Sequence, residues 1–197
     1  QGSFIYDKEN IEDSLKNNLP LTKETSKILL SNVAGLEVYN SLNCWIKKHG
    51  DIELWQSSVD EKFKGLSTSY TESKQLGIDR WLAMVASWDK YHSSLCVVNC
   101  GTALTIDLVD IHGHHLGGYI MPGAELMHKA LMRNTDKINV SMTNIASLDY
   151  ASNTQAAVNN GVFLALVSAI ERIVNKFSVE SGVMPKCIIS GGNAELI

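Results

Sequence analysis

The segment from Val97 to Val109 most constrains what this chain can fold into. An apolar run ends in the small residues Gly101 and Thr102, and a second run of alternating pattern begins at once. This pattern predicts a β-hairpin with a tight turn that exposes backbone N–H groups and a threonine hydroxyl. Because glycine has no Cβ, a phosphate oxygen could approach the backbone of such a turn closely. A simple structural turn is the alternative, since two small residues beside a threonine are a weak signal.

Apolar patterning along the rest of the chain predicts an alternation of helices and strands. We expect helices at 36–48, 79–88, 124–133 and 154–177, a short helix near 60–63, buried strands at 27–33 and 187–190, a strand at 52–55, and a three-stranded meander over 94–99, 103–109 and 115–120. Such alternation favours the α/β class. A meander that leads into helices is typical of the actin-like (ribonuclease-H-like) ATPase fold, although a doubly wound sheet has the same periodicity.

Composition bounds the class of protein. The chain has 197 residues, a net charge of −4 and 45% hydrophobic residues. This length fits one compact domain or two small ones. The acidic balance disfavours non-specific nucleic-acid binding, which depends on excess Lys and Arg. With no signal peptide and no stretch long enough to cross a membrane, we expect a cytoplasmic protein without a membrane partner. Four cysteines without a C-x-x-C pair are expected to be buried free thiols.

A carboxylate and a guanidinium adjoin each other at the predicted start of the 79–88 helix. Asp79 could act there as a general base that accepts a hydroxyl proton during phosphoryl transfer. Arg80 could then bind an anionic group, because its forked donors match carboxylate and phosphate oxygens. The alternative is a helix N-cap at Asp79 that pairs with Arg80.

Other polar groups remain open to two interpretations. His112, His114 and His115 cluster in one short polar turn, and a solvated turn is favoured over a metal site. Asp107 is either a solvated strand residue or a metal-facing carboxylate. Gly191-Gly192-Asn193 after a strand either allows a nucleobase to approach the backbone or forms a strand-to-helix turn. The chain has no Walker-type phosphate loop.

Four blocks in the same order and with the same spacing resemble the type III pantothenate kinases, also called the Bvg accessory factor family. The blocks are Tyr70 before Leu76-Gly77-Ile78-Asp79-Arg80-Trp81, the segment from Asn99 to Asp107, Gly117-Gly118-Tyr119-Ile120-Met121-Pro122-Gly123, and Asn153-Thr154 with Gly161 downstream. They are similar to Y-x-x-P-x-x-L-G-x-D-R-W, D-x-G-T-A-x-T-x-D, G-G-x-I-x-P-G and N-T-x-x-A-x-x-x-G. Each block is weak alone, and the four together are specific.

The resemblance implies a homodimeric actin-like kinase with two similar halves, here 1–90 and 91–197. It would phosphorylate pantothenate to 4'-phosphopantothenate with ATP and Mg²⁺, the first step of coenzyme A biosynthesis, assisted by K⁺ or NH₄⁺. The implied roles are proton acceptor for Asp79, pantothenate binding for Tyr70, Gly77, Ile78, Asp79, Arg80 and Thr154, ATP binding for Gly101 and Thr102, and a monovalent-cation ligand at position 99.

The chain departs from the family pattern at several points. Asn99 stands where the family has the Asp that binds the monovalent cation, and an amide oxygen coordinates cations without that charge. Ser73 replaces a usual Pro, and the segment 134–139 departs from T-A-x-L-P. The D-x-G-N-T phosphate loop of the family's first strand is absent, and so are a C-terminal strand and helix, so we expect sequence missing at both ends. Asn99 and the 134–139 segment motivate an alternative, a non-catalytic accessory or regulatory protein of the Bvg accessory factor type. Another actin-like sugar or acid kinase is a weaker possibility.

Overall fold

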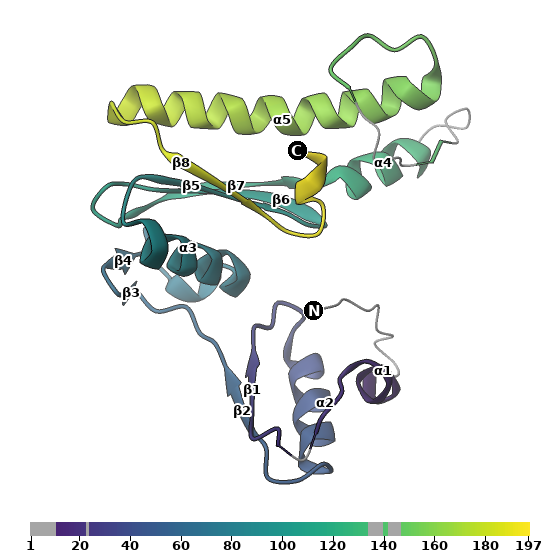
Figure 1. Ribbon diagram of the computed structural model, residues 1–197, viewed down its shortest axis with the longest axis vertical. Coiled ribbons are helices and arrows are strands. Elements are labelled where there is room, and N and C mark those ends of the chain that lie inside the picture. Colours follow the sequence, from purple (N-terminus) through teal and green to yellow (C-terminus); the bar gives the residue numbers. More distant parts are fainter. Residues whose placement is uncertain (1–10, 23, 134–139, 142–146) are drawn as a thin grey trace. The chain divides into compact units, whose positions relative to one another are not determined.

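The computed structural model describes residues 11–22, 24–133, 140–141 and 147–197. The described residues form two compact units, which we call the N-terminal unit (Gln1–Val59 and Lys74–Trp81) and the sheet unit (Asp60–Ser73 and Leu82–Ile197). Both can be followed in Figure 1. The elements are α1 Ile11–Asn18, β1 Lys27–Leu30, α2 Leu36–Lys47, β2 Glu53–Gln56, β3 Lys62–Phe63, β4 Leu66–Ser67, η1 Ser73–Gln75, α3 Ile78–Tyr91, β5 Leu95–Cys100, β6 Ala103–Val109, β7 His115–Pro122, α4 Ala124–Arg133, α5 Thr154–Ser181, β8 Lys186–Ser190 and η2 Ala194–Leu196. The predicted division into halves at residue 90 stays a prediction.

The N-terminal unit is built around a βαβ motif. β1 and β2 pair in parallel, and α2 connects them. Their small core consists of Leu42, Trp45 and Ile46 on α2, against which Ile28 and Leu30 of β1 are partly buried. The neighbouring Leu29 points the other way and is 73% exposed. The prediction of a buried strand at 27–33 is therefore wrong, because the described residues cover only one face of this two-stranded sheet.

The sheet unit contains the predicted meander and one further strand. The order of its sheet is β7-β6-β5-β8, with antiparallel pairs except for the parallel pair β5–β8. Figure 1 shows α5 running along one face of this sheet. The buried core on that face joins side chains from β5 and β6 to α4 and α5: Cys96, Val98, Cys100, Leu104, Ile106, Ala124, Leu166, Ile170 and Ile173. The predicted meander and the helices at 124–133 and 154–177 are confirmed.

A tight hairpin replaces the short helix expected near 60–63. β3 and β4 pair antiparallel, and the two residues between them, Lys64 and Gly65, both have positive φ (49° and 89°). Two positive φ values are the signature of a type I′ turn, whose twist matches that of the strands. The indole Nε1 of Trp88 donates to the carbonyl of Lys64 at 3.2 Å and fixes the hairpin to α3 within the sheet unit.

The four cysteines are free thiols, as predicted, but only two are buried. Cys96 and Cys100 lie inside β5, whereas Cys44 and Cys187 are exposed. Cys187 belongs to β8, most of whose residues are exposed, so the prediction of a buried strand at 187–190 is also wrong. Cys96 lies opposite Cys187 in the parallel register. A hydrogen bond between the two thiols raises the pKa of Cys96, with burial adding to the effect, and lowers the pKa of Cys187.

The segment 134–139, which departs from the family pattern, is not among the described residues. None of the helices in the described part of the chain combines the length and apolar content that a membrane span requires.

Two glycines hold the β5–β6 turn. The N–H of Gly123 donates to the carbonyl of Thr102 at 2.9 Å. A Cβ on Gly123 would stand 2.8 Å from that oxygen, and a Cβ on Gly191 would stand 2.6 Å from Oδ1 of Asn99. Gly191 also has φ +101°, a conformation that L side chains rarely adopt. The backbone that follows β8 therefore lies against the end of β5, next to the β5–β6 turn. The short helix η2 follows directly. This agrees with a strand-to-helix turn at 191–193.

We predict that Gly191→Ala destabilises the protein by about 1–3 kcal/mol, because it combines a positive φ with a collision against β5. Chemical denaturation monitored by circular dichroism measures the free energy of unfolding. Gly192→Ala is the matched control, since nothing lies within 4 Å of its added Cβ. Equal stability of the two variants would contradict the close approach at Gly191.

Candidate active site

The β5–β6 turn presents a threonine hydroxyl from a rigid frame. The N–H of Gly101 donates to the carbonyl of Ala103 at 3.1 Å, and the N–H of Asn193 donates to the carbonyl of Cys100 at 3.0 Å. The side chain of Thr102 is exposed, and the structure gives its hydroxyl no hydrogen-bond partner among the residues it describes. A hydroxyl held out by a fixed turn can donate to a phosphate oxygen.

Asn99 lies next to this turn, near the end of β5. It is half-buried, and it pairs in register with Ser190 of β8. Its amide oxygen faces the backbone at Gly191, as the 2.6 Å separation from a Cβ at that glycine shows. Asn99, Gly101 and Thr102 are thus brought together, and an amide oxygen in this place is a possible cation ligand.

The start of α3 carries the predicted acid–base residue. α3 begins at Ile78, so Asp79 is the second residue of the helix and not its N-cap. The carboxylate folds back over Gly77, where a Cβ would stand 2.7 Å from its Oδ1. Asp79 is exposed and makes no hydrogen bond or ion pair with the described residues of its own unit. An exposed carboxylate with no partner in its unit is chemically available as a proton acceptor.

A cavity of about 410 Å³ adjoins this helix start within the N-terminal unit. Gly77 and Ile78 line it, together with Asn32 after β1 and the segment 56–59, which begins with the last residue of β2. Among the described residues that line the cavity, Lys74 is the charged one. A half-polar cavity with a cationic side chain suits a small polar anion.

Arg80 differs from its neighbour in burial. Its side chain belongs to the buried set at 4% exposure, next to Trp81 at 2%. Charged side chains are buried this deeply only when they have partners, and Arg80 does interact with another group. Arg80 is thus a fixed guanidinium rather than a solvated one.

Tyr70 lies in another part of the sheet unit. Its ring stacks on that of His115, with 5.9 Å between ring centroids and 10° between planes. His115 pairs with Val109, at the opposite end of β6 from the Gly101–Thr102 turn. The structure therefore does not bring Tyr70 to that turn.

The buried pair of Asp107 and His115 was missed by sequence reasoning. His115 Nε2 lies 2.9 Å from Oδ1 of Asp107, and their side chains are 0% and 2% exposed. His115 is thus not part of a solvated turn, and Asp107 is neither solvated nor one of three clustered metal ligands in the described chain. A charged residue inside an apolar strand needs a polar partner, and this requirement was the available signal.

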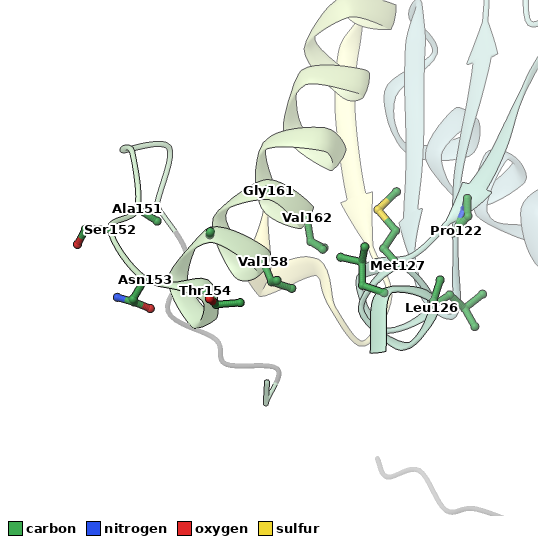
Figure 2. Close-up of a pocket in the computed structure, with 13 residues that line it drawn as sticks. Pro122, Leu126, Met127, Ala151, Ser152, Asn153, Thr154, Val158, Gly161 and Val162 are labelled. Atoms are coloured by element: carbon green, nitrogen blue, oxygen red, sulfur yellow. The ribbon is translucent and has the colours of Figure 1, made fainter. Parts of the chain in front are cut away.

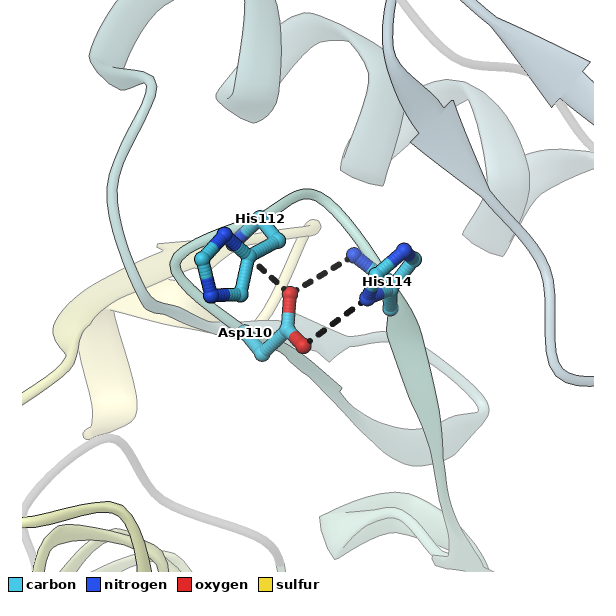
Figure 3. Close-up of polar contacts among 3 residues, drawn as sticks. All are labelled: Asp110, His112 and His114. Atoms are coloured by element: carbon cyan, nitrogen blue, oxygen red, sulfur yellow. Dashed lines mark hydrogen bonds and ion pairs between the residues drawn. The ribbon is translucent and has the colours of Figure 1, made fainter.

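The exposed part of the histidine turn agrees with the solvated interpretation. Figure 3 shows that Asp110 organises the turn: its Oδ1 accepts from the N–H groups of His112 and His114, both at 2.8 Å. The ring Nδ1 of His114 lies 3.1 Å from the other oxygen of Asp110. Burial opposes ionisation of Asp110, but these hydrogen bonds outweigh it and lower its pKa.

Thr154 is the first residue of α5 and opens onto a large groove. Asn153 caps the helix by accepting from the N–H of Ala156 at 2.9 Å. Figure 2 shows the groove, of about 1230 Å³, between the first turns of α5 and helix α4. Its walls are mostly apolar and include Leu126 and Val158. The polar groups at one end include Ser152, Asn153 and the Thr154 hydroxyl, together with the positive end of the α5 dipole.

Comparisons with known proteins identify the family of this chain. Residues 1–176 match the profile of the type III pantothenate kinase family. A type III pantothenate kinase from Nitrosococcus oceani is 34% identical over 179 residues, which cover 88% of this chain and 67% of the relative. One from Nitrosospira multiformis is 35% identical over 173 residues, covering 88% and 65%. The chain thus spans about two thirds of the length of these curated relatives.

A solved structure shares the fold. The crystal structure of a conserved Baf family protein from Campylobacter jejuni, described as a transcriptional activator, has a TM-score of 0.63 at 23% identity. The match covers 95% of this chain and 75% of that one. The profile match over most of the chain and the alignment with curated relatives lead to one conclusion: this chain belongs to the type III pantothenate kinase family.

Proposed function

We propose that the protein transfers the terminal phosphoryl group of ATP to the primary hydroxyl of pantothenate, giving 4'-phosphopantothenate, the first step of coenzyme A biosynthesis. Family membership supports this reaction, and it does not favour a non-catalytic accessory role. The observation that carries the proposal is the exposed Asp79 carboxylate in the first turn of α3, beside a half-polar cavity. The cytoplasm, where ATP is available, is the proposed location.

An actin-like (ribonuclease-H-like) fold is part of the proposal. Three antiparallel strands followed by a parallel fourth, in the order β7-β6-β5-β8, suit one half of such a fold. The TM-score of 0.63 to a solved relative of low identity supports a shared architecture. Two similar halves, 1–90 and 91–197, remain the proposed organisation.

In the proposed mechanism, Asp79 accepts the hydroxyl proton as the pantothenate oxygen forms its bond to the terminal phosphorus and ADP leaves. Gly77 and Ile78 line the cavity next to this carboxylate. The pantothenate carboxylate would be held by fixed donors, with Arg80, Tyr70 and Thr154 proposed for binding. Guanidinium groups and helix N-termini both favour anions.

ATP would bind at the β5–β6 turn, with its phosphates close to the Cβ-free backbone at Gly101 and in contact with the hydroxyl of Thr102. The fit rests on the exposed Thr102 side chain and the Cβ-free backbone at Gly101. The described residues contain no group of three or more His, Cys, Asp or Glu side chains placed to hold a metal ion. Mg²⁺ would therefore be held largely by phosphate oxygens and water, and it would neutralise phosphate charge.

We predict that Asp79→Asn lowers kcat for pantothenate phosphorylation by about 10²–10⁴-fold, the usual contribution of a general base. A coupled assay for ADP release, with pantothenate as the acceptor, measures this. Asp89→Asn on the same helix is the matched control, because Asp89 is an exposed carboxylate paired with Lys64 at 2.8 Å. A fully active Asp79→Asn enzyme would refute the assignment of the base.

Asn99 is proposed as a weakened site for a monovalent cation, K⁺ or NH₄⁺. The surroundings of Asn99 fit a monovalent cation in part, because its amide oxygen lies in a confined place between β5 and Gly191. The side chain supplies a ligand oxygen but no negative charge, which lowers the expected affinity.

Asn99→Asp should therefore lower the K⁺ concentration for half-maximal activity, because a carboxylate attracts the cation more strongly than an amide. Initial rates over a K⁺ series, at constant ionic strength maintained with Na⁺, would show the shift. The same K⁺ dependence in both proteins would argue against a cation at position 99.

A homodimer is proposed, with α5 near the interface and Thr154 facing the partner's site. The apolar groove between α4 and α5 supports this, because its wall exposes large side chains such as Leu126, at 41%. Exposed apolar patches of this kind mark interaction surfaces.

Analytical ultracentrifugation at micromolar concentration should show a dimer, and Leu126→Glu should shift it toward monomer by burying a charge in the interface. Val179→Glu, at the other end of α5 and 84% exposed, is the control that should remain dimeric. A wild-type monomer at this concentration would count against the proposed dimer.

A further inference from the structure

A buried histidine connects three groups in the sheet unit. On one side, His115 Nε2 lies 2.9 Å from Oδ1 of Asp107. On the other, its Nδ1 lies 3.4 Å from Oγ1 of Thr68. Its ring face stacks against Tyr70. Both ring nitrogens and one ring face thus have contacts, so the orientation of the imidazole is defined by its surroundings.

One arrangement of protons satisfies the donors and acceptors of this network. The backbone N–H of Tyr70 donates to Oγ1 of Thr68 at 3.2 Å, so the Thr68 hydroxyl can donate its own proton to Nδ1 of His115. Nε2–H of His115 then donates to the Asp107 carboxylate. In this arrangement, assigned from the hydrogen-bond network, Nε2 carries the proton that faces Asp107. The network links a carboxylate inside β6 to the backbone and the ring of Tyr70.

The unfavourable desolvation of Asp107 and His115 indicates what this buried pair does. Taking a carboxylate and an imidazole out of water is unfavourable, so a buried pair of this kind adds little net stability. Its distinctive effect is geometric, because it holds the imidazole that contacts Tyr70 and Thr68. The neighbouring His114 pairs instead with Asp110, its side chain is 63% exposed, and its backbone forms a bridge with Ser67.

We propose that His115 is a positioning residue for pantothenate binding: held by Asp107, it fixes the ring and backbone of Tyr70. The inference rests on the proposed function, in which Tyr70 contacts pantothenate. His115 itself touches neither substrate nor the reacting atoms. Its loss should therefore affect substrate affinity through the freedom of Tyr70, while the transfer step is left largely intact.

His115→Gln tests this in the intact protein, because glutamine can still donate to Asp107 but offers neither the ring face nor Nδ1. Hydrogen–deuterium exchange of peptides covering residues 66–72 should become about tenfold faster or more. The KM for pantothenate should rise about three- to tenfold, the cost of ordering one side chain on binding. The values of kcat and of the KM for ATP should stay within about twofold, since only substrate binding is affected.

Two further variants keep the test decisive. His114→Gln is the matched control and should change neither exchange nor kinetics. Thr68→Val leaves the buried pair in place but removes the hydroxyl between His115 and the Tyr70 backbone. It should reproduce the exchange effect and the KM effect even if His115→Gln does not fold.

The outcomes separate the two proposals. If both variants fold and hydrogen–deuterium exchange at residues 66–72 is unchanged in His115→Gln and Thr68→Val, the positioning role is overturned. This holds whatever the enzymatic activity of the variants is. Faster exchange with an unchanged pantothenate KM, or with kcat and both KM values altered together, would overturn the link to substrate binding. A wild-type protein that does not phosphorylate pantothenate would instead refute the proposed function, and exchange would still decide the positioning of Tyr70.

Discussion

The close approach of two glycine backbones to the β5–β6 turn is the constraint on which the sheet unit depends. Gly123 links the turn to the start of α4, and Gly191 links it to the end of β8. No side chain could occupy either place without displacing the turn. The path of the chain into α4 and the position of β8 in the sheet therefore both depend on the conformation of the turn that exposes Thr102. The proposed phosphate-binding feature is thus part of the framework and not an appendage to it.

Much of the sheet unit could be predicted because its signals are local. The run from Val97 to Val109 alternates around a small-residue turn, and β5 and β6 form there as expected. Burial of β8 could not be predicted, because the apolar run at 187–190 carries no information about what covers its faces. The Lys64–Gly65 turn was also missed, since its positive φ values depend on a hairpin with strands of only two residues.

In the candidate site, too, some residues could be located from local sequence signals and others could not. Asp79 and Thr102 could be located from the sequence because a helix start and a hairpin turn each expose their residues by local geometry. The network around His115 could not, because Thr68 lies 47 residues from it along the chain and only the folded sheet brings them together. The histidine cluster was misleading for a related reason. His115 begins β7 and is buried, whereas His114 precedes the strand and its side chain is exposed.

The parallel pairing of β5 with β8 has a consequence for how the protein is made. Ser190 Oγ donates to the carbonyl of Val98 at 3.3 Å, although the two residues are 92 positions apart. Contacts of such long sequence separation form slowly, because a large loop must close first. During synthesis the turn that carries Thr102 leaves the ribosome long before Gly191, so its final shape must wait for the end of β8. Substitutions that weaken β8 should therefore lower the yield of correctly folded protein as well as its stability.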